Sequence, residues 1–403
     1  MSVKNDQNLI DEILTRSIDT IYPDRQAFEN LLKSGKSLRI YMGIDPTATY
    51  AHLGHATNYI ILKRLHELGH KIIVLIGDFT AMIGDPSDKS SARKRLTEEE
   101  VKENFKTFKD QIGKILDFSD LENPIELRFN SEWLNKLTLK EAVELASHFT
   151  VQRMLERDVF EKRIKEKKPL YVHEFFYPLM QGYDSVALEA DVEIGGTDQT
   201  FNMLAGRILV KDYQHREKIV VTTTLLENPV TGEKLMSKSL GTGIGLNESP
   251  QEMFGKTMAL PDEAIIQVFI DCTYLSMVEI KELEMSLKSG TNPRDIKNRL
   301  AFEIVKMYHS KEDAAQAREN FDKLFKDKEI PDDMPEFHLG AKNILDVLME
   351  TKLAASKGEA RRLVDGGGVK VDGKVVPDYE FMVQSIPAGV VVQKGKRGFV
   401  KVF

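Results

Sequence analysis

The stretch SLRIYMGIDPTATYAHLGHATNYIILKRLHELGHKIIVLI, residues 37–76, decides the fold. Its first part, residues 37–44, is a short apolar run bounded by Gly35 and Pro46, which indicates a strand. Residues 53–68 carry apolar side chains at helical spacing, Gly69 ends this helix, and residues 71–76 are typical of a second strand. A strand, a crossover helix and a strand in this order predict a parallel sheet.

The composition is that of a folded protein with several domains. Of 403 residues, 41% are apolar and 30% are charged, which excludes the disordered and fibrous classes. At roughly 100–200 residues per domain, this length predicts two to four domains. No apolar run approaches the roughly 20 residues that span a bilayer, and the N-terminal stretch has no signal-peptide core. Cys272 is the single cysteine, which excludes an intrachain disulfide and a cysteine-based zinc site, so we expect a cytoplasmic protein.

The charge is unevenly distributed along the chain. The net charge is -7, yet residues 341–403 hold 11 lysines and arginines against 7 acidic residues. Two segments are candidate boundaries: 241–250, which is rich in glycine, and 327–337, which collects proline and acidic residues. We therefore expect an α/β domain at 1–245 with an inserted helical segment at about 88–190. A helical domain at 246–330, a linker at 331–340 and a small, more basic α+β domain at 341–403 follow in this division.

Two histidines stand where the first strand ends and the helix begins, in the pattern His52-Leu53-Gly54-His55. Open α/β sheets bind ligands at this edge. The N–H groups of a helix N-terminus and two imidazoles suit a polyphosphate, and Gly54 has no Cβ to obstruct a flat base. A lone histidine is usually an ordinary structural residue, but this pair at a strand-to-helix turn favours a nucleotide site.

A second polar loop, residues 232–241, reads Gly-Glu-Lys-Leu-Met-Ser-Lys-Ser-Leu-Gly. Lysine and serine side chains in a mobile loop can stabilise charge on a departing pyrophosphate. Alone, such a loop is usually solvated surface, but the histidine turn upstream favours a shared site. A third pattern places Tyr177, Gln181 and Asp184 at positions i, i+4 and i+7, on one face of a predicted helix.

These patterns resemble the signatures H-I-G-H and K-M-S-K-S of the class I aminoacyl-tRNA synthetases, here at 52–55 and 235–239. The resemblance is closest to the bacterial tyrosyl-tRNA synthetases and runs from about Leu38 through the C-terminal domain. It is also carried by Tyr177-x-x-x-Gln181-x-x-Asp184, by Gly-Gly-Thr-Asp-Gln at 195–199 and by Ile-Gly-Asp-Pro-Ser at 83–87.

The resemblance implies a Rossmann-like catalytic domain, then an anticodon-binding helical domain and an S4-like RNA-binding domain. It implies that the chain activates L-tyrosine with ATP, releases pyrophosphate and transfers tyrosyl to the 3′ end of tRNA(Tyr). ATP is then a substrate, Mg²⁺ accompanies the nucleotide, and no structural metal is expected. The resemblance also implies a homodimer. Our candidate contact is a helix from about Glu132 to Leu155, with Trp133, Leu134, Leu137 and Phe149.

By the same resemblance, site residues receive individual roles. The ammonium group of tyrosine is assigned to Asp85, Tyr177 and Gln181, and its phenol hydroxyl to Tyr41 and Asp184. Phenylalanine would leave such a hydroxyl-reading pair without a partner. The residues facing ATP are Gly43, Asp45, Thr47, His52, Gly54, His55, Gly196, Asp198, Gln199 and Lys238. The residues assigned to phosphate charge in the transition state are Thr47, His52, His55, Lys89, Arg93 and Lys238. The RNA contacts expected in the tail are Lys357, Arg361, Arg362, Lys370 and Lys374.

Two positions depart from the family pattern. Leu235 stands at the first position of K-M-S-K-S, with Lys234 displaced one place earlier. Glu193 stands where many bacterial relatives carry glutamine, and its charge is expected to retune the amino-acid pocket. Two alternatives stay open: a tryptophanyl enzyme, which has no use for a hydroxyl-reading pair, and an RNA-binding or regulatory protein whose synthetase-like body is inactive.

Overall fold

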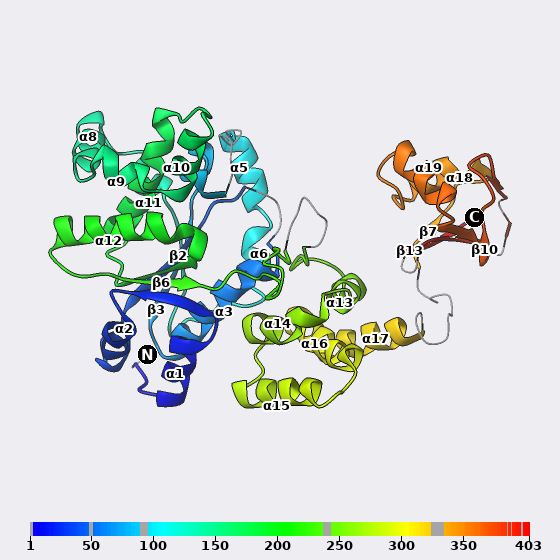
Figure 1. The fold of residues 1–403 in the computed structure, drawn as a ribbon, viewed down its shortest axis with the longest axis horizontal. Coiled ribbons are helices and arrows are strands. Elements are labelled where there is room, and N and C mark those ends of the chain that lie inside the picture. The colour runs from blue at the N-terminus through cyan, green and yellow to red at the C-terminus, as the bar shows by residue number, and fades with distance from the viewer. Residues whose placement is uncertain are drawn as a thin grey trace.

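The computed structural model describes residues 3–47, 51–88, 96–236, 243–323, 334–384, 386–387, 389–395 and 398–403. Within these residues a helix-covered sheet, a group of helices and a small strand-rich domain follow one another along the chain (Figure 1). The predicted fold class, α/β around a parallel sheet with a helical part and a small α+β part, is confirmed. None of the described helices is both long and apolar enough to cross a membrane.

The main sheet has the strand order β1-β6-β5-β2-β3-β4. The central strand β2 (Arg39–Ile44) is parallel to β3 (Lys71–Ile76) on one side and to β5 (Val192–Gly196) on the other. The parallel part is extended by β4 (Glu126–Phe129) and β6 (Ile219–Thr223), and β1 (Ile18–Tyr22) is an antiparallel edge strand. The predicted unit of two strands joined by α3 (Leu53–Glu67) is confirmed.

The carboxyl ends of β2 and β5 form the switch point of this sheet. The chain leaves β2 toward β3 through α3, whereas it leaves β5 toward β6 through α12 (Thr200–Gln214). Right-handed crossovers that run in opposite directions place their helices on opposite faces, and Figure 1 shows α3 and α12 on the two sides of the sheet. A crevice therefore opens between these two strand ends.

Short helices surround the sheet. The N-terminal pair is α1 (Gln7–Thr15) and α2 (Arg25–Lys33). Between β3 and β5 lie α4 (Thr80–Ile83), η1 (Pro86–Asp88), α5 (Glu98–Phe105), α6 (Phe108–Ile112), α7 (Ser131–Leu134), α8 (Leu139–Ser147), α9 (Val151–Leu155), α10 (Asp158–Lys165), η2 (Val172–Phe175) and α11 (Phe176–Ala187). The short helix η3 (Thr197–Gln199) precedes α12. The segment expected to be an inserted helical one thus also contributes β4 to the sheet.

The prediction of a single helix from Glu132 to Leu155 is wrong. Residues 131–155 form three separate helices, α7, α8 and α9. The breaks fall at Thr138 and Thr150, whose side chains accept hydrogen bonds from the backbone N–H groups of Glu141 and Arg153 and thus start new helices. A mixture of apolar and charged residues does not reveal these caps, which depend on single hydroxyl groups.

The helical part consists of α13 (Pro250–Met258), η4 (Asp262–Ala264), α14 (Ile265–Cys272), α15 (Met277–Lys288), α16 (Pro293–Tyr308) and α17 (Lys311–Asp322). Buried residues of α13, α14 and α16 belong to the same hydrophobic cluster as those of β2, β3 and α3. The sheet and these helices therefore share one core.

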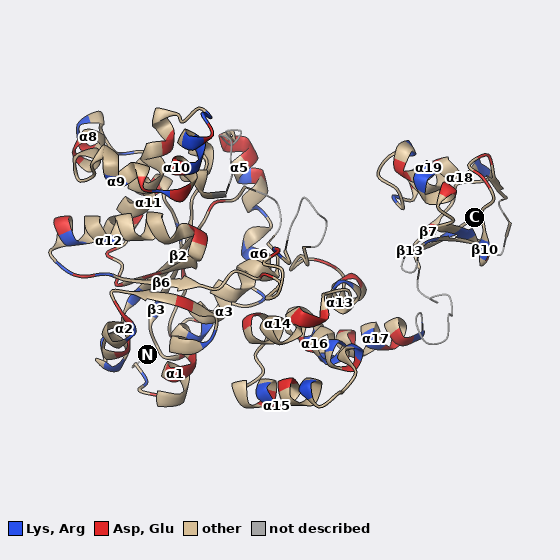
Figure 2. Ribbon diagram, viewed as in Figure 1, with Lys and Arg blue, Asp and Glu red and all other residues tan. Residues whose placement is uncertain are grey.

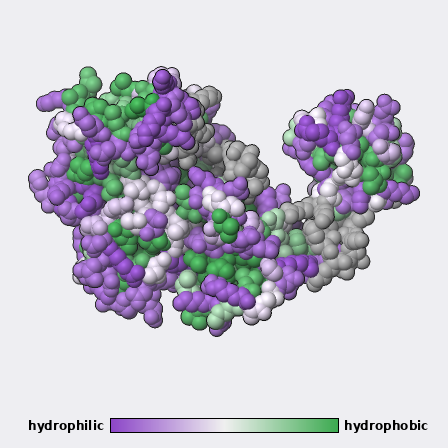
Figure 3. Space-filling model, in the orientation of Figure 1, coloured by the Kyte–Doolittle hydropathy of each residue, from purple (hydrophilic) through white to green (hydrophobic). Residues whose placement is uncertain are grey.

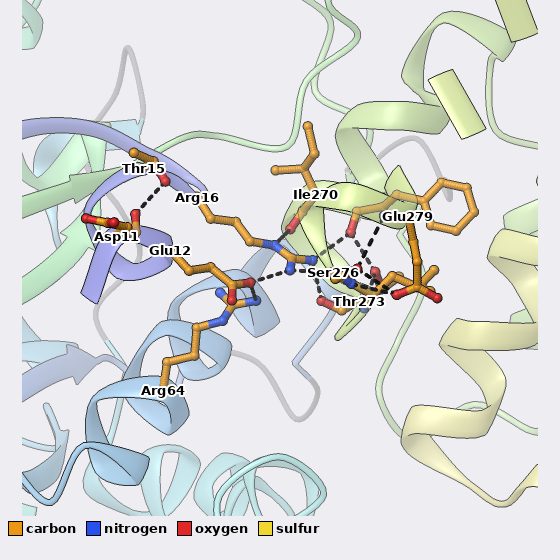
Figure 4. A network of polar contacts seen from close by, with 11 residues as sticks. Asp11, Glu12, Thr15, Arg16, Arg64, Ile270, Thr273, Ser276 and Glu279 are labelled. Carbon is orange, nitrogen blue, oxygen red and sulfur yellow. Dashed lines mark hydrogen bonds and ion pairs between the residues drawn. The ribbon is translucent and has the colours of Figure 1, made fainter. Parts of the chain in front are cut away.

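Arg16, which follows α1, ties the N-terminal helices to α14 (Figure 4). Its buried guanidinium donates to the backbone carbonyls of Ile270 (2.7 Å), Leu275 (2.7 Å), Thr273 (2.7 Å) and Phe269 (3.2 Å). It also donates to Glu12 (2.6 Å), which pairs in addition with Arg64 of α3 at 3.2 Å. One side chain thus satisfies carbonyls at the end of α14, where a helix has no internal donors of its own.

The C-terminal domain has its own core. Its elements are β7 (Glu336–Phe337), β8 (Lys342–Asn343), α18 (Ile344–Glu350), α19 (Lys357–Asp365), β9 (Val369–Val371), β10 (Lys374–Val375), β11 (Met382–Val383), β12 (Val390–Lys394) and β13 (Gly398–Val402). The predicted hairpin around Asp372-Gly373 is present, and both turn residues have positive φ, 46° and 78°. Strand β7 pairs in parallel with β13, so residues 336–337, which fall in the expected linker, belong to this sheet.

Candidate active site

A cavity of about 880 Å³ opens at the carboxyl ends of β2 and β5. The predicted site residues that line it are Gly43, Asp45, Thr47, His52, Gly54, His55, Asp85, Tyr177, Gln181, Asp184, Gly196, Asp198 and Gln199. They come from strand ends, from the start of α3 and from one face of α11, as their patterns indicated. The structure thus brings into one cavity residues that are more than a hundred positions apart in sequence.

Three predicted site residues, Lys89, Arg93 and Lys238, lie outside the described residues. The start of the second signature is described. Leu235 is buried in the main core, while the displaced Lys234 lines the cavity. The departure from the family pattern therefore still brings a lysine to the cavity wall.

The two histidines lie against each other at the start of α3. Their ring centroids are 3.9 Å apart, and the backbone N–H of His52 donates to Nδ1 of His55 (3.2 Å). Because Nδ1 of His55 accepts, the ring of the neutral tautomer carries its proton on Nε2. Burial lowers the pKa of His52 to about 4. Burial and the neighbouring His52 lower the pKa of His55 to about 3, so both rings are neutral at pH 7.

Asp45 and Asp85 are held by hydrogen bonds on the cavity wall. Asp45 accepts from the Tyr177 hydroxyl (2.8 Å) and from Oγ1 of Thr80 (2.7 Å). The buried Asp85 accepts from Nε2 of Gln199 (2.7 Å) and from Nη2 of Arg157 (3.1 Å). The donors fix the direction of both carboxylates before any ligand arrives.

Asp184 is buried at the inner end of the cavity, on α11. Its carboxylate accepts from the indole Nε1 of Trp133 (2.7 Å) and from Nδ2 of Asn130 (3.3 Å). Burial raises the pKa of Asp184 well above its ordinary value, and these two hydrogen bonds oppose the rise. A partly desolvated carboxylate of this kind can read a hydroxyl group by accepting its proton in a hydrogen bond.

Tyr41 is not among the residues that line the cavity. Its side chain is fully buried, packs with Ile73, Leu75 and Leu188, and its hydroxyl lies 2.7 Å from Oγ of Ser185. The structure therefore does not bring Tyr41 onto the wall beside Asp184. Its hydroxyl belongs instead to a buried polar group that also includes Lys218 and Glu193.

The residues that support the site were not identified from the sequence. Asn130, Trp133 and Arg157 orient cavity carboxylates, and Lys218 pairs with Glu193 behind the wall. None of them lies in a recognisable motif. Trp133, which we expect at a dimer contact, donates its indole N–H to Asp184, and Leu134 beside it is buried.

The basic residues predicted to contact RNA lie in the C-terminal domain. Lys357, Arg361 and Arg362 are exposed on α19, where Figure 2 shows basic residues, and Lys370 and Lys374 lie on the β9–β10 hairpin. Lys357 pairs with Asp346 at 3.1 Å, and the Arg361 guanidinium lies 5.5 Å from the ring centroid of Tyr379.

The family of the chain follows from comparisons with known proteins. The model of the class I tRNA synthetases for tryptophan and tyrosine matches residues 33–326, and a tyrosine–tRNA ligase C-terminal domain model matches residues 327–402. The chain therefore belongs to the class I tRNA synthetases of this family. Tyrosine–tRNA ligases from Carboxydothermus hydrogenoformans and Thermotoga maritima are 46% and 45% identical to it, each over 97% of this chain and at least 96% of their own length.

A solved structure shows the same fold. A C-terminally truncated mitochondrial tyrosyl-tRNA synthetase from Aspergillus nidulans is 24% identical and superposes with a TM-score of 0.67, covering 79% of this chain and 94% of its own. Within the family, the activity of the chain is that of a tyrosine–tRNA ligase, which first forms an aminoacyl-adenylate from ATP and then esterifies tRNA.

Proposed function

We propose that the cavity at the ends of β2 and β5 is where tyrosine and ATP react. The tyrosine carboxylate attacks the α-phosphorus in line, tyrosyl-adenylate forms and pyrophosphate leaves. The observation that carries this proposal is the convergence in one cavity of Asp184 and Gln181, assigned to tyrosine, with His52 and His55, assigned to ATP. The 3′-terminal ribose hydroxyl of tRNA(Tyr) then attacks the acyl carbon.

In this proposal catalysis consists of positioning and of stabilising phosphate charge, with no covalent nucleophile. The neutral imidazoles of His52 and His55 donate N–H groups to phosphate oxygens, and Thr47 donates its hydroxyl there. Gly196, Asp198 and Gln199 hold the ribose and the adenylate. Lys89, Arg93 and Lys238 act on the pyrophosphate. Mg²⁺ arrives with the nucleotide, since it binds chiefly through substrate phosphates and water.

At the other end, Asp85, Tyr177 and Gln181 take the ammonium group of tyrosine, and Asp184 accepts from its phenol. The preformed hydrogen bonds to Asp85 and Asp184 support these roles, because oriented carboxylates need little reorganisation on binding. Tyr41 acts indirectly, through Ser185, which follows Asp184 on α11.

Amino-acid-dependent ATP–pyrophosphate exchange with each of the twenty amino acids tests the proposal. We expect a signal with tyrosine and little with phenylalanine or tryptophan. Asp184→Ala is expected to lower the preference for tyrosine over phenylalanine by about 10- to 100-fold, the value of one hydrogen bond to a charged group.

The matched control is Asp110→Ala, which removes an exposed aspartate on α6 and is expected to leave the preference unchanged. An undiminished preference in Asp184→Ala would exclude Asp184 as the hydroxyl reader and revive the tryptophanyl alternative. Absence of exchange with every amino acid, from folded protein with Mg²⁺, would favour the RNA-binding alternative instead.

We also propose a homodimer whose contact lies on the segment between β3 and β5. Large apolar side chains are exposed there: Leu139 (82%) and Val143 (62%) on α8, Val151 (66%) on α9 and Val172 (76%) on η2. Figure 3 shows hydrophobic surface gathered over this end of the molecule. Contiguous exposed apolar surface of this kind is typical of a protein interface.

Sedimentation equilibrium tests the dimer, with an expected mass of twice 45.8 kDa. The double variant Leu139→Glu/Val143→Glu is expected to be monomeric. In a two-fold contact the same patch of both copies meets, so the new carboxylates would be buried in the contact close to those of the second copy. Lys140→Glu, an exposed change between them, is the control. A monomeric wild-type chain, or an unchanged dimer in the double variant, would rule out this contact.

The second substrate, tRNA(Tyr), is proposed to lie along the helical part and the C-terminal domain. Lys357, Arg361, Arg362, Lys370 and Lys374 are proposed contacts to its phosphates, a mode of binding that depends on salt and carries little sequence information. We propose that the enzyme works in the cytoplasm, where protein synthesis uses charged tRNA.

A further inference from the structure

A buried polar network lies directly behind the amino-acid end of the cavity. Lys218, just before β6, pairs through its ammonium group with Glu193 of β5, and both side chains are almost completely buried. The same ammonium donates to Oγ of Ser185 on α11 (2.7 Å), which lies 3.2 Å from the Glu193 carboxylate. The network thus joins two strands and the helix that carries the tyrosine-facing residues.

The fold makes room for this lysine. A Cβ on Gly206 of α12 would lie 2.6 Å from both Nζ of Lys218 and Oγ of Ser185, so a larger residue at this position would have to displace the ammonium group and the hydroxyl. Burial lowers the pKa of Lys218, and the adjacent Glu193 carboxylate opposes the shift. A buried carboxylate without a cation would be costly, because desolvation disfavours its charged form.

The network touches the cavity through Gln181. Its amide Nε2 donates to Oε1 of Glu193 (3.3 Å), and Gln181 itself lines the cavity. An ionised carboxylate can only accept hydrogen bonds, so it holds the NH₂ side of the Gln181 amide. The carbonyl oxygen of Gln181 is then the atom presented to a ligand, and a carbonyl oxygen is what an ammonium group requires.

We propose that Lys218 and Glu193 are positioning residues that keep the Gln181 carbonyl directed at the ammonium group of tyrosine. The ammonium group of Lys218 holds the Glu193 carboxylate in place, and this carboxylate fixes the orientation of the Gln181 amide. The inference rests on the proposed role of Gln181. Glu193, which departs from the family pattern, thus brings no uncompensated charge to the pocket, because Lys218 balances it. Its effect on the pocket is to orient Gln181.

The test compares tyrosine with 3-(4-hydroxyphenyl)propionate, which is tyrosine without its ammonium group. Lys218→Met is expected to raise the KM for tyrosine in ATP–pyrophosphate exchange about tenfold, the value of one charge-assisted hydrogen bond, with a smaller change in kcat. The inhibition constant of the deaminated compound is expected to change less than about twofold. Glu193→Gln should behave alike, because a neutral amide can either donate or accept and no longer fixes Gln181.

The double variant Glu193→Gln/Lys218→Met should lose no more than either single variant, since both act through one contact. Lys211→Met, which removes an exposed lysine of α12, is the control. If Lys218→Met does not fold, the isosteric Glu193→Gln carries the same comparison. An unchanged KM for tyrosine, or an equal loss for both compounds, would overturn the proposal.

Gln181→Ala separates this inference from the proposed function beneath it. It should lower the preference for tyrosine over the deaminated compound about tenfold, the value of one charge-assisted hydrogen bond, since Asp85 and Tyr177 remain. If Gln181→Ala keeps that preference, the assignment of Gln181 to the ammonium group is wrong, and the inference fails with it. If Gln181→Ala lowers the preference while Lys218→Met and Glu193→Gln do not, only the role of the ion pair is refuted.

Discussion

His55→Ala is expected to lower the rate of tyrosyl-adenylate formation by about 10²- to 10³-fold, while the affinity for tyrosine changes less than about threefold. The reason is that the neutral ring, held through Nδ1 by the His52 backbone, presents Nε2–H where phosphate charge develops. By its place in the second signature, Lys238→Ala is expected to act similarly. Single-turnover adenylate formation and equilibrium dialysis of tyrosine measure the two quantities.

The control is His215→Asn, because His215 is exposed and asparagine tolerates its positive φ of 53°. Since the pKa of His55 is lowered to about 3, the wild-type rate should show no ionisation of this ring between about pH 6 and pH 8. Unchanged single-turnover rates in both His55→Ala and Lys238→Ala would refute the assignment of the two signatures. A wild-type ionisation in this range that vanishes in His55→Ala would contradict the neutral ring.

Arg16→Met is expected to lower the free energy of unfolding by about 3–5 kcal/mol. Methionine fills much of the same space but donates nothing, so the carbonyls of Ile270, Thr273 and Leu275 lose this donor. Phe269 keeps the Thr273 hydroxyl, and Glu12 keeps Arg64. Arg16→Lys should lose less, since lysine keeps the charge but cannot span the same set of acceptors. Urea-induced unfolding, followed by circular dichroism, measures the effect.

Arg25→Met, an exposed arginine at the start of α2, is the control and should change the free energy of unfolding by less than about 0.5 kcal/mol. If Arg16→Met unfolded at the same urea midpoint as the wild type, the guanidinium that joins α1, α3 and α14 would not contribute to stability. Such a result would mean that water replaces the guanidinium at these carbonyls.

Much of the site could be predicted because many of its polar residues lie close together in the sequence, in short recognisable patterns. His52 and His55 lie three positions apart in the first turn of α3, and Tyr177, Gln181 and Asp184 share one face of α11. The Asp372-Gly373 pair likewise predicted the hairpin of β9 and β10 correctly. In each case the geometry is set by neighbours a few positions away, so that spacing in the sequence is also spacing in the structure.

The supporting contacts could not be predicted in this way. Trp133 lies 51 positions from Asp184 and Arg157 lies 72 positions from Asp85, and nothing in their own surroundings in the sequence marks them. The single helix predicted from Glu132 to Leu155 also failed because of a local cap, since the hydroxyl of Thr138 starts a new helix. A period describes one element, whereas these contacts depend on how several elements are packed.

The sequence by itself determined the βαβ core, the edge of the sheet at which the cavity opens, and thirteen of the 27 described residues that line this cavity. The tertiary structure decided that Tyr41 lies behind the wall, that Trp133 faces Asp184, and that the charge of Glu193 is balanced by Lys218. The physical reason is the same in each case. Burial removes water from these polar groups, so each needs a hydrogen-bond or ion-pair partner from a residue that the packing of other elements places next to it.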